Sequence, residues 1–508
     1  MVGLRLMEII LGPPGTGKTT YLLEQMEKEL DRGTPPDRIG FVSFTRRAAQ
    51  EAKDRAKKKF KLGDKDLPWI RTLHSLCFRA LGLSSAEVLE GKKLQEFSEW
   101  IGQPISSFVS FEEGGMFGYE TGDRCMFIDN LARVRGISLR DQFEESRDNI
   151  PWPLVERFSR GLAEFKRIRS LMDYTDMLVE FVQSNWSARL EVLFVDESQD
   201  LSMAQWAVVG HLAKGTRRVA IAGDDDQAIY RWAGAAVDHF IQLPGQATVL
   251  DHSWRVPKEI QDIALSIISS IRVRRPKVWN PRDGEGILKR SQNLDNAGLD
   301  VDEDTLILAR NSCFLRDDAI RMLNSAGILY EYKGHTSVRQ ALVDAIVNWE
   351  KLRKGEEIPV DQAQKIYEEM RSGVGYTRGH KKLPAWEDRD QPVSLADLKE
   401  AGGLLTDAPW HDALTRMTLV EQTYMRAAMR KGQRLTQRPN IRISTIHGAK
   451  GAQADHVILL TDIASRTMLE SRRLPDDEAR TWYVAVTRAK QKLTIVSPQI
   501  NQLKAYRI

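Results

Sequence analysis

Residues 12–19 form a glycine-rich segment whose groups could surround the phosphates of a nucleotide. They read Gly-Pro-Pro-Gly-Thr-Gly-Lys-Thr, after a short apolar run and before a run of helix-forming residues. In this GxxxxGK[ST] spacing the glycines let backbone N–H groups wrap the phosphates. Lys18 can reach the β and γ oxygens, and the Thr19 hydroxyl can bind Mg²⁺. The segment predicts a P-loop; a chance glycine-rich turn is the alternative.

A pair of carboxylates ends another apolar run far along the chain. Residues 192–195 are followed directly by Asp196 and Glu197. Beside a P-loop, Asp196 would hold Mg²⁺ and Glu197 would orient or deprotonate the attacking water. An exposed acidic turn is the alternative. Together the two motifs predict a nucleoside triphosphatase but not its purpose, because many protein classes use P-loops.

The composition is that of a globular protein with several domains. The chain has 508 residues, 42% hydrophobic and 28% charged, and it contains no run long enough to span a bilayer. Residues 1–10 lead directly into the glycine-rich segment, so we expect a buried strand there and no targeting segment. The three cysteines lie far apart, which argues against disulfides or structural zinc. A cytoplasmic location, in a bacterial or phage-infected cell, is expected.

The net charge is mildly basic, at +4 with a pI near 8.7. Such a balance permits nucleic-acid binding without demonstrating it. Basic side chains gather in residues 57–61 and 272–277. For either cluster alone we expect a solvated face.

Apolar runs that resemble strands recur between helix-like segments, in two groups. The runs are residues 8–11, 39–44, 192–195, 219–222, 306–309, 441–445, 457–460 and 493–496. This alternation predicts two α/β cores with parallel sheets. Two stretches without it, residues 84–170 and 335–440, are predicted to be inserted, mainly helical subdomains. Within the second, residues 371–384 are expected to form a solvated loop, or a flexible loop facing nucleic acid.

Several further strings occur in a fixed order along the chain. They are FTRRAA (44–49), RTLHSLC (71–77), DYTDML (173–178), DESQD (196–200), GDDDQAIYRWAGA (223–235), HSWR (252–255), STIHGAKG (444–451) and WYVAVTRA (482–489). Together with the P-loop they resemble the motifs of the UvrD/Rep/PcrA-type superfamily 1A DNA helicases, and the resemblance covers nearly the whole chain apart from the two insertions.

The resemblance implies an α/β fold with two RecA-like P-loop NTPase cores, each carrying an inserted helical subdomain. The implied division is residues 1–90 plus 172–251 for core 1A, 91–171 for insertion 1B, 252–337 plus 437–508 for core 2A, and 338–436 for a reduced insertion 2B.

The same resemblance assigns roles in ATP hydrolysis. The implied catalytic residues are Lys18, Asp196, Glu197, Gln227, Arg255 and Arg488, the two arginines acting as fingers that the second core offers to the γ-phosphate. The implied ATP-binding residues are Gly12, Gly15, Gly17, Lys18, Thr19, Thr20, Trp254, Gly451 and Gln453. Thr19 and Asp196 would bind Mg²⁺.

Residues for binding DNA are implied as well. Phe44, Tyr230 and Trp232 would stack on bases. The residues expected to contact the DNA backbone are Thr45, Arg47, Thr72, His74, Thr445 and His447.

The resemblance therefore implies an ATP-dependent helicase that moves 3′→5′ on single-stranded DNA and unwinds duplexes, binding junctions as a monomer beside replication or repair proteins, with no membrane contact. A translocase that displaces proteins or remodels intermediates with little unwinding is the alternative; a scaffold with an inactive ATP site is a second. The sequence departs from the family in three places: no glutamine precedes Gly12, Ala233 replaces an arginine, and Gln453 replaces a glutamate. These departures leave base selectivity and coupling to DNA open.

Overall fold

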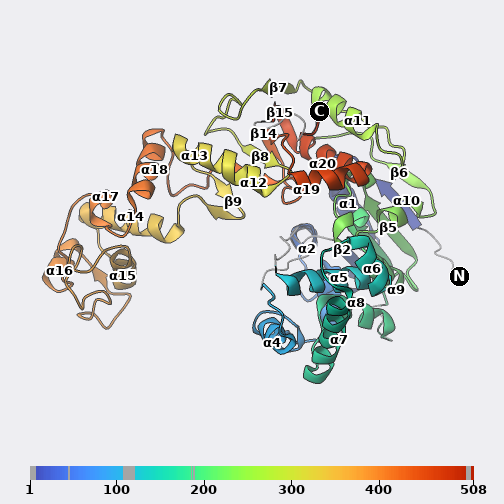
Figure 1. The fold of residues 1–508 in the computed structure, drawn as a ribbon, viewed down its shortest axis with the longest axis horizontal. Coiled ribbons are helices and arrows are strands. Elements are labelled where there is room, and N and C mark those ends of the chain that lie inside the picture. The colour runs from blue at the N-terminus through green and yellow to red at the C-terminus, as the bar shows by residue number, and fades with distance from the viewer. Residues whose placement is uncertain (1–6, 44–45, 107–119, 185, 187–188, 499–504) are drawn as a thin grey trace. The chain divides into compact units, whose positions relative to one another are not determined.

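The computed structural model describes residues 7–43, 46–106, 120–184, 186, 189–498 and 505–508, apart from the side chains of residues 46–48. The chain divides into two compact units (Figure 1). The first consists of residues 1–286 with 466–490 and Ile508, and the second of residues 287–465 with 491–507.

The first unit is built on a parallel sheet with the strand order β3-β2-β4-β5-β1-β6. The strands are β1 (Met7–Leu11), β2 (Ile39–Ser43), β3 (Ile70–Thr72), β4 (Val192–Asp196), β5 (Arg218–Gly223) and β6 (Ala247–Val249). β2 and β4 are buried at every position, because central parallel strands are covered on both faces. β5 lies between β1 and β4, so the turn after β5 leaves the sheet between the P-loop and the carboxylate pair.

Helices connect these strands and complete the core of the first unit. They are α1 (Lys18–Asp31), α2 (Arg46–Phe60), α3 (Leu73–Ala80), α8 (Tyr174–Gln183), α9 (Met203–Leu212) and α10 (Val237–Gln242). α11 (Lys258–Ile268) packs against α20 (Pro475–Val486), which returns to this unit from much later in the chain. Asp173 caps the N-terminus of α8, where its side chain and that of Asp176 form a reciprocal cap.

Among the described residues of the stretch 84–170, which the sequence predicts to be an insertion, the α-helices are α4 (Lys92–Ile101), α5 (Thr121–Arg135), α6 (Leu139–Ser146) and α7 (Trp152–Arg169). α5 packs against both α6 and α7 (Figure 1). Their apolar faces enclose a separate core that includes Phe97, Phe158 and Phe165.

The second unit contains a seven-stranded sheet with the order β10-β9-β13-β8-β14-β15-β7. The strands are β7 (Ile287–Ser291), β8 (Thr305–Ala309), β9 (Glu331–Tyr332), β10 (His335–Thr336), β13 (Ile441–Thr445), β14 (Ala454–Leu460) and β15 (Ala489–Val496). β8 pairs in parallel with β13 and β14, whereas β10 is antiparallel to β9. α12 (Ser312–Phe314), a π-helix (Leu315–Ile320) and α13 (Arg321–Ala326) follow β8.

The stretch between β10 and β13 is mainly helical and has its own core around Trp349 and Tyr367. It contains α14 (Gln340–Arg353), α15 (Val360–Glu368), α16 (Leu395–Glu400), α17 (Trp410–Ala413) and α18 (Leu419–Arg430), with a short antiparallel pair of β11 (Ile358–Pro359) and β12 (Pro392–Val393). Residues 371–384 are not simply a solvated loop, because Tyr376 and Leu383 are buried and Tyr376 stacks on Tyr367 at 5.1 Å between ring centroids.

The predicted α/β fold with parallel sheets is confirmed, and the division into four domains stays a prediction. Within the described residues, no helix has the length and apolar character needed to cross a membrane. All three cysteines are free thiols; Cys77 and Cys125 are buried, and Cys313 is half-buried.

Candidate nucleotide-binding site

The P-loop joins β1 to α1 in the first unit. The Gly12 N–H donates to the carbonyl of Gly223 at the end of β5 (3.1 Å), which ties the start of the loop to the sheet. Gly17 has φ 79° and is the residue from which α1 begins. The Lys18 ammonium donates to the carbonyl of Gly12 (2.8 Å), and the Thr16 hydroxyl donates to that of Pro13 (2.8 Å). The loop is thus closed on itself, with its lysine over the turn.

Two of the predicted ATP-binding glycines lie so close to other side chains that only glycine fits there. A Cβ on Gly12 would lie 1.9 Å from Cγ of Lys18. A Cβ on Gly15, whose φ is 75°, would lie 2.4 Å from Cβ of Arg255. Both positions therefore exclude any side chain, as expected where backbone must approach phosphates.

The carboxylate pair stands opposite the start of α1. The Thr19 hydroxyl donates to Oδ2 of Asp196 (2.7 Å), and the Glu197 N–H donates to Oδ1 of the same side chain (2.9 Å). Asp196 is fully buried. Burial and the adjacent Glu197 raise the pKa of Asp196 to about 7, although Thr19 and Lys18 act in the opposite direction. A cation bound beside Asp196 would therefore stabilise the ionised form of this carboxyl.

These groups fit Mg²⁺, which prefers oxygen ligands and keeps several waters and substrate phosphates around it. Thr19 and Asp196 offer two adjacent oxygens. Across the described parts of the chain, no group of three or more His, Cys, Asp or Glu side chains is arranged to hold a metal by itself. A metal in this site would complete its shell with waters and phosphate oxygens.

Gln199 orients the second carboxylate, a role that the sequence reasoning did not assign. Its Nε2 donates to Oε2 of Glu197 (2.6 Å), and its Oε1 accepts from the Asp224 N–H (3.0 Å). Glu197 has φ 50°, a left-handed conformation that a non-glycine residue seldom adopts. Such strain is typical of functional positions.

Two arginines from distant parts of the chain complete the site within the first unit. The Ser253 hydroxyl donates to the Pro14 carbonyl (2.7 Å) and the Trp254 N–H to that of Gly15 (2.9 Å), which anchors Arg255 beside the P-loop. Among the described residues, the buried Nε of Arg255 has no hydrogen-bond partner. Burial lowers the pKa of Arg255.

Arg488 follows α20 and is almost completely buried. Its Nε donates to the Val484 carbonyl (3.0 Å) and its Nη2 to Oε1 of Gln227 (2.9 Å). Burial and the neighbouring charge of Arg255 lower the pKa of Arg488 to about 9. Two desolvated guanidinium groups that repel each other, one with an unpaired Nε–H, fit a polyanion such as a triphosphate.

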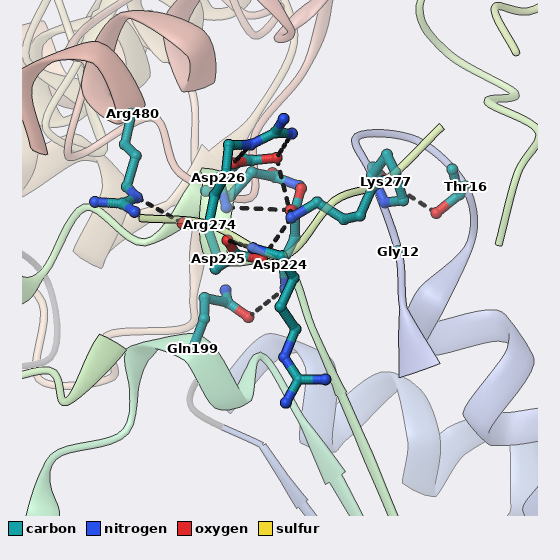
Figure 2. A network of polar contacts seen from close by, with 12 residues as sticks. Gly12, Thr16, Gln199, Asp224, Asp225, Asp226, Arg274, Lys277 and Arg480 are labelled. Atoms are coloured by element: carbon teal, nitrogen blue, oxygen red, sulfur yellow. Dashed lines mark hydrogen bonds and ion pairs between the residues drawn. The ribbon is translucent and has the colours of Figure 1, made fainter. Parts of the chain in front are cut away.

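The turn after β5 holds a second charged cluster, shown in Figure 2. Asp224, Asp225 and Asp226 are all fully buried, and the ammonium of Lys277 contacts all three carboxylates. Arg274 forms two bonds to Asp226, at 2.8 and 2.5 Å. The expectation of a solvated face for residues 272–277 is therefore wrong at these positions, because three buried carboxylates need cations. By contrast, Lys58, Lys59 and Lys61 in the other basic cluster are exposed.

The remaining predicted ATP-binding residues are Thr20, Trp254, Gly451 and Gln453. Trp254 is 75% exposed and meets the His252 ring edge-on at 4.4 Å between centroids. Thr20 is exposed on the first turn of α1. Gly451 and Gln453 belong to the second unit, where the Gln453 carbonyl accepts from Arg442 (2.8 Å). Their roles stay predictions.

The predicted DNA-binding residues are spread over both units. Phe44 and Thr45 lie outside the described residues, and Arg47 is described only as backbone of α2. Thr72 caps α3, its hydroxyl accepting from the Ser75 N–H (3.3 Å), while His74 contacts Tyr174 edge-on at 5.8 Å between centroids.

Tyr230 and Trp232 lie on the turn that follows Gln227, their centroids 6.4 Å apart. Trp232 is half-buried, whereas Tyr230 is 7% exposed, so Trp232 is better placed to receive a base. Thr445 and His447 follow β13 in the second unit, where the Thr445 hydroxyl accepts from the Gly448 N–H (3.1 Å).

Two family models match the chain. The model of the UvrD-like helicase C-terminal domain matches residues 135–499, and that of an AAA domain matches residues 5–233. The chain is 26% identical over 357 residues to an ATP-dependent DNA helicase PcrA from Leuconostoc citreum, which covers 66% of this chain and 46% of the relative. It is 25% identical over 299 residues to a PcrA helicase from Staphylococcus aureus strain Mu50, covering 55% of this chain and 40% of the relative. The chain thus spans less than half the length of these relatives.

Proposed function

Because the chain belongs to the UvrD-like helicase family, we propose that it is an ATP-dependent DNA helicase that moves 3′→5′ along single-stranded DNA, with ATP hydrolysis stimulated by that DNA. The observation that carries the proposal is the hydrogen bond between Arg488 and Gln227, 2.9 Å long, beside the P-loop and the carboxylate pair. This bond links Arg488, whose guanidinium can neutralise phosphate charge, to Gln227 on the turn that also carries Trp232.

In the proposed hydrolysis, this chain's residues bind and orient the reactants. Lys18 and the P-loop N–H groups hold the triphosphate, and Thr19 with Asp196 holds Mg²⁺. When bound, Mg²⁺ neutralises charge on the phosphate oxygens. Glu197 accepts a proton from the water that attacks the γ-phosphorus, while the bond to the ADP oxygen breaks.

Arg255 and Arg488 stabilise the negative charge on the transferring phosphoryl group. Both are desolvated, so each interaction with an anion is stronger than it would be in water. Because Arg488 also donates to Gln227, a change in its position on ATP binding would move the Gln227 side chain. Gln227 would pass that change to the turn with Tyr230 and Trp232.

The wider proposal includes the four-part domain division and a grip on single strands and duplex junctions through stacking and backbone contacts. It also includes a monomeric motor, replication or repair proteins as partners, and a cytoplasmic location. The alternative is a translocase that displaces proteins with little unwinding.

The test is ATP hydrolysis with and without single-stranded DNA, followed with strand separation on duplexes carrying a 3′ or a 5′ tail. Stimulation with unwinding from the 3′ tail alone supports the helicase. Stimulation with displacement of streptavidin from a tailed strand, but no unwinding, supports the translocase. No stimulation by DNA contradicts both.

The Lys18→Ala variant identifies the site in this assay. It should lose turnover and retain binding of single-stranded DNA, because Lys18 lies in the P-loop and is not one of the residues predicted to bind DNA. Lys28→Ala is the matched control, since Lys28 is exposed at the other end of the same helix. An unchanged ATPase rate in Lys18→Ala would contradict the assignment.

A further inference from the structure

Three consecutive carboxylates without solvent contact depend on cations from other parts of the chain. Asp224, Asp225 and Asp226 follow β5, and Lys277 lies about fifty residues later, with a side chain that is 1% exposed. Its Nζ lies 3.0 Å from Oδ1 of Asp224 and 3.0 Å from Oδ2 of Asp226, and it also bonds Asp225 (Figure 2). Lys277 lies outside every string that resembles a helicase motif.

The three carboxylates differ in their other partners. Asp226 is also bonded twice by Arg274, and Asp225 accepts from the Arg275 N–H (2.9 Å). Arg480 of α20 donates to the Asp225 carbonyl (2.8 Å), not to its carboxylate. Asp224 has its ion pair with Lys277.

Asp224 in turn holds the side chain of Gln227. Gln227 Nε2 donates to Oδ2 of Asp224 (2.7 Å), and Gln227 Oε1 accepts from Arg488 (2.9 Å). An ionised carboxylate can only accept hydrogen bonds, so it fixes the amide with its NH₂ toward Asp224 and its oxygen toward the arginine. A protonated Asp224 could donate instead, and the amide could then rotate to set NH₂ against the guanidinium, two donors facing each other.

We propose that Lys277 is a positioning residue for ATP hydrolysis: it keeps Asp224 as an acceptor, and Asp224 keeps the oxygen of Gln227 turned toward Arg488. The inference rests on the proposed function and adds to it a residue from outside the recognised motifs. Burial raises the pKa of Asp224, but Lys277 and Lys18 outweigh burial and hold it below its ordinary value.

The test is the Lys277→Met variant of the full chain, assayed for DNA-stimulated ATP hydrolysis. Displacing catalytic groups by about 1 Å can lower the rate by up to about 100-fold, so we expect kcat of this variant to fall on the order of 10- to 100-fold. The KM for ATP should change less than about threefold, since the ion pairs of Lys277 are with Asp224, Asp225 and Asp226. Lys258→Met, at an exposed lysine paired with Asp262, is the matched control and should keep the wild-type kcat.

A second variant separates positioning from plain charge balance. Lys277→Met alone leaves buried carboxylates without their cation and should lower the melting temperature. The double variant Lys277→Met/Asp225→Asn also removes one of the buried negative charges, so its melting temperature should return toward the wild-type value. Its kcat should stay low, because Asp224 still lacks its cation. Recovery of kcat together with stability would overturn the inference, as would a wild-type kcat in Lys277→Met alone. Absence of DNA-stimulated hydrolysis in the wild-type chain would instead overturn the proposed function, and the inference with it.

Discussion

Replacing Asp196 by asparagine should stabilise the nucleotide-free protein while abolishing its activity. Asp196 is fully buried, and burial with Glu197 raises its pKa to about 7 from an ordinary value of 3.8. The folded chain therefore keeps this proton up to about pH 7, whereas the unfolded chain releases it near 3.8. Because the folded state binds more protons between these values, its stability falls as pH rises through them.

The size of the effect follows from the same pKa values. Each pH unit in that window is worth about 1.4 kcal/mol. The free energy of unfolding of Asp196→Asn should exceed that of the wild type by roughly 2 kcal/mol at pH 5 and roughly 4 kcal/mol at pH 8. The asparagine keeps a similar shape. Its Oδ1 can accept from the Glu197 N–H, and its Nδ2 can donate to the Thr19 hydroxyl.

Urea unfolding at several pH values, followed by tryptophan fluorescence, measures this difference. Asp361→Asn is the control, since Asp361 is exposed and bound to Lys365, which lowers its pKa; this variant should be slightly less stable at neutral pH. Mg²⁺ with a nucleotide should stabilise the wild type more than Asp196→Asn. A gap between the two proteins that is the same at pH 5 and pH 8 would refute the reasoning, because it would then arise from packing and not from ionisation.

Three further outcomes are expected. Gly15→Ala should lower ATP hydrolysis at least about 10-fold, because the added methyl group would collide with Arg255. Gly33 has a similar φ of 88° and open space around it, so Gly33→Ala should lose only about 1 kcal/mol of stability. Unfolding and ATPase assays on both variants test this difference. Trp232→Ala should weaken binding of single-stranded DNA by about 1–3 kcal/mol in fluorescence titrations, and unchanged affinity would exclude it as a stacking platform. Arg488→Lys should lower kcat on the order of 10³-fold with nucleotide affinity nearly kept, as stopped-flow binding and turnover would report.

The strands that the sequence predicts lie mostly in the interior of the sheets. β2, β4 and β8 are mainly apolar and are buried at every position, so their composition identifies them. The strands that it misses include the edge strands of both larger sheets, β3, β6, β7 and β10. β7 is exposed at four of its five positions and β6 has only three residues, so neither carries the apolar pattern of a buried strand.

The site residues likewise fall into those that the local sequence predicts and those that it does not. Lys18, Thr19 and Asp196 were found because each belongs to a local string with a fixed spacing, and the Thr19–Asp196 bond brings two such strings together. The sequence does not predict a role for Lys277, because its local sequence is that of an exposed basic cluster and its partners lie about fifty residues earlier. The available signal is the run Asp224–Asp226 itself, since three adjacent carboxylates need a cation nearby when they are buried.

The state of the three thiols makes the chain convenient for measuring motion between its two units. Cys77 and Cys125 are buried, and burial raises the pKa of both, which suppresses the thiolate that reacts with maleimides. Cys313 is the half-buried one, so replacing it with serine should leave a background without rapid labelling. One new surface cysteine in each unit would then carry a donor and an acceptor dye, and their energy transfer would report, molecule by molecule, whether ATP changes the separation of the units.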